Sequence, residues 1–117
     1  MGMSYVYAGS ASYPRFNDEL RRIVELFGGK VISEQQEPKS MSEFFMAGPL
    51  KYEMPEGTPE AFVKFVNDPY RYHSFEDTKA IVEFMAPKWK EAEAISWQIT
   101  EELRSCVENE EGWEIYE

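Results

Sequence analysis

The sequence has few of the residues on which thiol, imidazole and metal chemistry depend. Its 117 residues include one cysteine, Cys106, and one histidine, His73. A single cysteine excludes an intramolecular disulfide framework and fits a reducing compartment, so we expect a cytoplasmic protein. Zinc sites use three or four His, Cys or carboxylate ligands, and the sequence offers no such cluster. We therefore expect no metal, no cofactor and no enzymatic activity.

Long apolar runs and calcium-binding patterns are also missing. No apolar run approaches the ~18 residues that a membrane-spanning helix needs, and no basic-then-apolar leader opens the chain, so we expect no membrane contact. The acids are three Asp and nineteen Glu. Calcium loops need Asp or Asn at alternating positions around a central Gly, and no segment has that pattern.

What is present is typical of a folded domain. Hydrophobic residues make up 43% of the chain and aromatic residues 15%, which is too rich for a disordered acidic tail. A chain of this length buries a core without disulfides or metals. We expect one small α+β domain over residues 1–117.

The first third of the chain predicts a β-α-β opening. Residues 4–8 are aromatic and β-branched, which favours a strand, and residues 30–33 predict a second strand. Between them, apolar residues on one helical stripe predict a helix: Phe16, Leu20, Ile23, Val24 and Phe27. Gly28-Gly29 should end that helix, because glycine adopts the left-handed conformation at little cost.

The middle of the chain alternates loop, strand and helix signals. Residues 34–42 are polar and predict a loop, while residues 43–47 and 50–54 predict two strands. Thr58 as a cap and Pro59 at the first helical position predict a helix to about Asp68, with Phe62, Phe65 and Val66 buried. Ser74 and Asp77 have capping-box spacing, which predicts a helix through Ala86, before Pro87.

The last third predicts one long acidic helix. We expect this helix to cover about residues 88–108. Gly112 then breaks the helical pattern, and residues 113–116 predict a terminal edge strand. The whole pattern predicts three to five short strands packed with about four helices.

Negative charge is concentrated in the last 27 residues. Residues 91–117 hold nine acids and one base, Arg104, a net charge of −8, whereas residues 1–90 carry only −2. Such a field repels nucleic acid and anionic membranes, and it attracts basic proteins over a Debye length of about 8–10 Å. We therefore expect a basic protein partner and no direct binding of nucleic acid.

A helical wheel of this segment places Glu93, Glu101 and Glu108 opposite the core, with Trp97 among them. Rows of carboxylates can take the place of DNA phosphates, and a tryptophan can anchor the contact. We predict a non-enzymatic DNA mimic that occupies and inhibits the basic site of a DNA-binding protein or nuclease. The predicted binding residues are Glu93, Trp97, Glu101, Glu102, Glu108, Glu110 and Glu111. The alternative is a solvated helix face with ordinary Glu enrichment.

A second candidate site is the small-residue loop after the first predicted strand. Backbone N–H groups at Gly9, Ser10 and Ser12 can cradle an anion, although the GxGxxG and P-loop patterns are missing and any tight turn needs small residues. A nucleotide-processing enzyme acting at this loop is a further alternative. It requires a cleft in which carboxylates converge with His73.

The opening segment, Tyr5-Val6-Tyr7-Ala8-Gly9-Ser10 with a helix ending at Leu26-Phe27-Gly28-Gly29, resembles the start of a BRCT domain. The resemblance covers about a third of the chain, and the family's Thr-His strand motif has no His in residues 42–47. It implies a protein- or phosphopeptide-binding module with Ser10 contacting phosphate. The same opening is similar to nucleoside deoxyribosyltransferases, whose catalytic acid motifs have no counterpart here.

In acidity, size and aromatic content the chain resembles phage and bacterial DNA-mimic proteins. Toxin-immunity proteins have the same profile, because they also cover basic nuclease surfaces. A BRCT-like or immunity-type interaction module that uses another surface is therefore the alternative to DNA mimicry.

Overall fold

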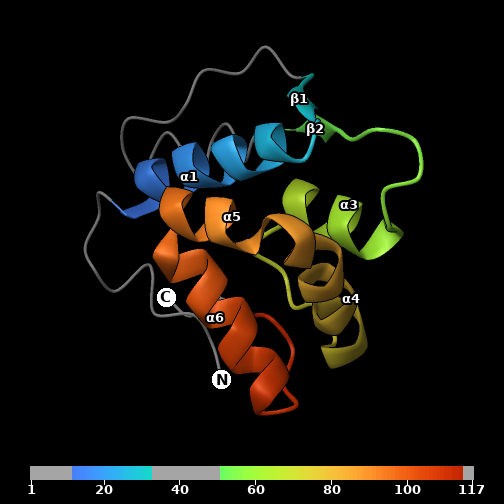
Figure 1. Cartoon of the computed structure of the whole chain (residues 1–117), viewed down its shortest axis with the longest axis vertical. Helices are drawn as coiled ribbons and strands as arrows, with labels where there is room; N and C mark the ends of the chain where they lie inside the picture. Colours follow the sequence, from blue (N-terminus) through green and yellow to red (C-terminus); the bar gives the residue numbers. More distant parts are fainter. Residues whose placement is uncertain (1–11, 33–50, 115–117) are drawn as a thin grey trace.

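The described part of the chain is mainly helical. The computed structural model describes residues 12–32 and 51–114 (Figure 1). The elements in chain order are α1 (Ser12–Leu26), β1 (Lys30–Val31), β2 (Tyr52–Glu53), α3 (Glu60–Asn67), α4 (Phe75–Met85), a 3₁₀ turn (Ala86–Lys88), α5 (Trp89–Ile95) and α6 (Trp97–Glu108). The strands predicted at 4–8 and 43–47 and the loop predicted at 34–42 lie outside the described residues.

Helix α1 forms as its apolar stripe predicts. Phe16, Leu20, Ile23 and Val24 are buried in the core. Gly28 follows with φ 89°, in the left-handed region, and its N–H donates to the carbonyl of Glu25. A Cβ at Gly29 would lie 2.5 Å from Val24 Cγ1 and 2.5 Å from Met54 Sδ. The Gly-Gly stop is thus confirmed, because one glycine supplies the turn and the other lets the chain pass close to α1.

The sheet in the described residues consists of β1 and β2. They pair antiparallel, with Lys30 opposite Glu53 and Val31 opposite Tyr52. Each strand has two described residues, fewer than the four and five that were predicted. The Asn67 side chain joins this sheet to α3, since its Oδ1 accepts from Tyr52 N at 2.7 Å and its Nδ2 donates to Tyr52 O at 3.2 Å.

Helix α3 buries Phe62, Phe65 and Val66, as predicted, but the predicted cap is wrong. Pro59 occupies the N-cap position, and the Thr58 hydroxyl donates instead to the Pro55 carbonyl at 2.7 Å. Thr58 therefore closes a local turn and is not available to α3.

Helix α4 begins as its capping-box spacing predicts. Ser74 is the N-cap, and its Oγ accepts from the backbone N–H of Asp77 at 3.1 Å. Ile81 and Met85 are fully buried. Pro87 lies in the 3₁₀ turn that separates α4 from α5, which confirms the predicted interruption.

The single helix predicted over residues 88–108 is wrong, because the chain breaks at Ser96. Ser96 has an extended backbone, with φ −148° and ψ 96°, and its buried Oγ accepts from Ile99 N at 3.2 Å. The hydroxyl thereby caps α6 while α5 ends before it. Helix α5 lies beside α1, and α6 packs against α4 and α5 (Figure 1).

The end of α6 also differs from the prediction. The helix stops at Glu108, before the predicted break at Gly112, and Glu110 follows in the left-handed region with φ 55°. Gly112 has another role, since a Cβ there would lie 2.1 Å from the carbonyl oxygen of His73. Of the edge strand predicted at 113–116, only Trp113 and Glu114 are described, and Trp113 forms an antiparallel bridge with His73.

Trp113 completes the core. Its ring is fully buried, with centroid distances of 4.8 Å to Phe65 and 6.3 Å to Phe16. Its indole N–H donates to the Pro69 carbonyl at 2.7 Å. The radius of gyration, 13.3 Å, is that of a compact chain of this length. The protein is thus a small compact domain, consistent with the α+β class.

Candidate functional site

The outward face of α6 carries part of the predicted binding surface. Trp97, Glu101, Arg104 and Glu108 follow one another at spacings of four, three and four residues, which places them on one stripe. The opposite side of the helix buries Ile99, Thr100, Leu103 and Cys106. Trp97 is 61% exposed, whereas Trp113 is 0% exposed. Because burial of tryptophan is the norm in a small core, Trp97 is the more unusual of the two.

Arg104 lies between the two carboxylates of this stripe and binds both. Its Nη2 is ion-paired with Glu101, and its Nη1 donates to Glu108 Oε1 at 2.5 Å. The Arg104 hydrogen bond lowers the pKa of Glu101, and Glu101 in turn raises the pKa of Arg104. The stripe therefore has a net charge of −1, and both carboxylates already face a cation.

The helical wheel misplaced Glu93. It put Glu93 beside Trp97 by assuming a continuous helix, but the extended backbone of Ser96 removes that phase relation. Both side chains are exposed, Glu93 on α5 and Trp97 at the first position of α6. They therefore lie on different helices and do not share a helix face.

The remaining predicted acids differ in exposure. Glu110 is exposed, whereas Glu102 and Glu111 are partly buried. Burial raises the pKa of Glu102, and Glu101 adds to the effect. The Glu111 backbone N–H donates to the Cys106 carbonyl at 2.8 Å. Of the seven predicted residues, Glu93, Trp97, Glu108 and Glu110 have the most exposed side chains.

Cys106 lies on the buried side of α6, next to Glu102. Burial raises the pKa of its thiol to about 11, and the Glu102 carboxylate contributes in the same direction. The thiol is therefore protonated at neutral pH. Within residues 12–32 and 51–114, no three or more His, Cys, Asp or Glu side chains are grouped so as to hold a metal ion.

The predicted anion loop is not placed by the structure. Gly9 and Ser10 lie outside the described residues, and Ser12 begins α1 with a side chain that is not described. Anion binding at this loop stays a prediction.

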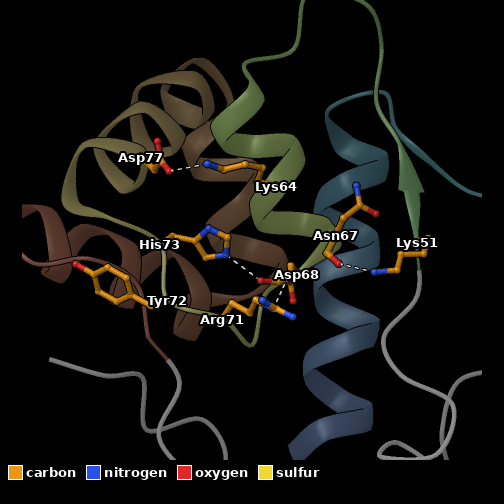
Figure 2. A pocket seen from close by; sticks show the side chains of 8 residues that line it. All are labelled: Lys51, Lys64, Asn67, Asp68, Arg71, Tyr72, His73 and Asp77. Carbon is orange, nitrogen blue, oxygen red and sulfur yellow. Dashed lines mark hydrogen bonds and ion pairs between the residues drawn. The ribbon is translucent and has the colours of Figure 1, made fainter.

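An open pocket on another face was not predicted (Figure 2). Its volume is about 410 Å³. The lining residues come from the position before β2, from α3, from the following loop and from α4: Lys51, Lys64, Asn67, Asp68, Arg71, Tyr72, His73 and Asp77. Because these segments are separated in sequence, no local pattern marks the pocket. The only signal in the sequence was the cluster of aromatic and basic residues at 70–73.

His73 forms a wall of this pocket. The residue is 5% exposed, and its ring packs against Phe65 at a centroid distance of 5.7 Å. Nε2 lies 2.8 Å from the Asp68 carbonyl oxygen, which only accepts, so Nε2 carries the proton. In Figure 2 the ring lies between two ion pairs, Lys64–Asp77 at 3.1 Å and Arg71–Asp68 at 2.8 Å. Each of these two carboxylates thus faces a cation, and the enzyme alternative at the loop of residues 9–12 stays a prediction.

Comparisons with known proteins add no relative. No family model, no curated protein and no solved structure matches this chain. Among the described helices, none has both the length and the apolar character that crossing a membrane requires.

Proposed function

We propose that this chain is a non-enzymatic protein-binding domain that acts as a DNA mimic. Its acidic C-terminal segment docks on the nucleic-acid-binding site of a basic protein, a DNA-binding protein or nuclease, and blocks that site. The observation that carries this proposal is Trp97, which is 61% exposed one helical turn from Glu101. Exposed tryptophans with charged side chains beside them are typical anchor residues of protein–protein interfaces.

The Arg104 pairs do not oppose this role. Glu108 is 61% exposed at its side chain, and ion pairs between exposed side chains are weak because water screens them. Arginine and lysine side chains of a partner can therefore exchange with Arg104 at small cost. The net charge of −8 in residues 91–117 then guides the approach of the basic surface.

Capture from a cell lysate tests the proposal with three baits. The binding variant is Trp97→Ala/Glu101→Gln/Glu108→Gln. Glutamine is preferable to lysine, because two lysines beside Arg104 would place three cations on one helix face. The matched control is Glu60→Gln/Glu83→Gln, which removes the same charge at exposed positions on α3 and α4. Wild type and control should hold a protein that the binding variant loses.

Two elution steps make the test specific for mimicry. Short duplex DNA should displace the captured protein, because both would occupy one site, and added salt should release it. A fourth bait, Arg104→Gln, leaves Glu101 and Glu108 without their cation and should bind several-fold tighter. A partner that the binding variant retains, or that duplex DNA does not displace, contradicts DNA mimicry and favours an interaction module that uses another surface.

A further inference from the structure

The pocket of Figure 2 is electropositive in a strongly acidic protein. Three cations, Lys51, Lys64 and Arg71, and two carboxylates, Asp68 and Asp77, line it, which is a net charge of +1 with neutral His73. The chain as a whole carries −10. A local excess of cations against that background favours an anionic ligand.

Two of these cations, Arg71 and Lys64, retain donors for such a ligand. Arg71 binds Asp68 Oδ2 through Nε at 2.8 Å, and this bond uses one of the five guanidinium N–H donors. Its two Nη groups form the fork that matches two oxygens of a phosphate. Lys64 gives one of its three N–H donors to Asp77 at 3.1 Å. Asp68 is thus a positioning residue, because it binds Arg71 through Nε and leaves both Nη groups available to a phosphate.

An exposed aromatic ring borders the same pocket. Tyr72 is 63% exposed, although its neighbour His73 is buried. A Cβ at Gly112 would lie 2.8 Å from Cε1 and Cζ of Tyr72, so the ring packs directly on the Gly112 backbone. The ring is therefore supported at the border of the pocket, while most of the residue remains in solvent. Aromatic bases stack on such rings, whatever their identity.

We propose that this pocket binds a phosphorylated aromatic small molecule of the nucleoside monophosphate class. Arg71 holds the phosphate, Lys64 and Lys51 add positive charge to the lining, and the base stacks on Tyr72. The volume of about 410 Å³ is in the range of small-molecule sites. None of these residues lies on α6, so the proposal does not depend on the acidic surface.

A titration of the full ¹⁵N-labelled chain followed by NMR tests this site. The probes are adenosine 5′-monophosphate, adenosine and inorganic phosphate. The monophosphate should cause saturable shifts at Arg71, Tyr72 and His73, and it should bind tighter than either fragment. Arg71→Gln should weaken the monophosphate about tenfold or more, since it removes a charge-assisted fork. Tyr72→Ala should weaken the monophosphate without changing the affinity for phosphate.

Lys90→Gln is the matched control, because Lys90 is exposed on α5 and does not line the pocket. Its affinity for the monophosphate should equal that of wild type. The spectra of the variants also report that each is folded, as expected for substitutions of exposed side chains. The proposal is overturned if no saturable shift occurs at the pocket, if Arg71→Gln and Lys90→Gln behave alike, or if phosphate and the monophosphate bind equally.

Discussion

Replacing Trp113 by phenylalanine should remove a large part of the stability of this domain. The change deletes the indole N–H that donates to Pro69 at 2.7 Å, and the Pro69 carbonyl is buried. A buried acceptor left unpaired costs about 1–3 kcal/mol. The smaller ring also leaves space beside Phe65, which adds roughly 1 kcal/mol. We expect a loss of about 2–4 kcal/mol, against a total of about 5–15 kcal/mol for a typical domain.

Urea unfolding followed by circular dichroism measures this loss without relying on tryptophan emission. The matched control is Trp97→Phe, the same substitution at a side chain that is 61% exposed, which should change the free energy of unfolding by less than about 0.5 kcal/mol. Equal effects at the two tryptophans, or a cost below about 1 kcal/mol at Trp113, would refute the assignment of Trp113 to the core.

Three further perturbations test separate features. Gly112→Ala should lower the free energy of unfolding by about 2 kcal/mol or more, because the added Cβ would lie 2.1 Å from the backbone oxygen of His73. Thermal melting checks this, and a melting temperature equal to that of wild type would contradict the close approach. Asn67→Asp is isosteric but removes the side-chain donor to Tyr52 O and Val63 O. Urea unfolding should show a decrease of about 1–3 kcal/mol in the free energy of unfolding. An unchanged value would mean that these hydrogen bonds do not stabilise the contact between α3 and β2. Burial raises the pKa of Cys106 to about 11, so the folded state favours the protonated thiol more than the unfolded state does. The resulting contribution to the free energy of unfolding is fully present below about pH 9 and is lost as the pH rises towards 11. The free energy of unfolding should therefore fall more steeply over that window in wild type than in Cys106→Ala, and parallel profiles would contradict this.

Helices with a strong local signal could be predicted from the sequence. The stripe ending in Gly28-Gly29 predicts α1, and the side-chain cap at Ser74 predicts the start of α4. The errors arose where tertiary contacts decided between local options. Ser96 breaks a periodic apolar pattern because its buried hydroxyl caps α6. Glu110 adopts the left-handed conformation after this helix, whereas Gly112 is required where the backbone passes close to the carbonyl oxygen of His73.

The site was predictable only in part. Trp97 is exposed, as its predicted place on the helix requires. Arg104 binds Glu101 and Glu108, and these ion pairs follow from spacings of three and four residues, which a sum of charges does not show. The pocket was not predictable, because Lys51 and Arg71 are brought together only when the segment before β2 lies beside the loop after α3.

The place of Trp113 in the core has a consequence during synthesis. Its ring packs against Phe16, which precedes it by 97 residues. At about 5–20 residues per second, roughly 5–20 s separate the synthesis of the two residues. During that interval the apolar stripe of α1 has no Trp113 to cover it, so the nascent chain presents an unfinished core to chaperones and to neighbouring nascent chains until Trp113 has been added.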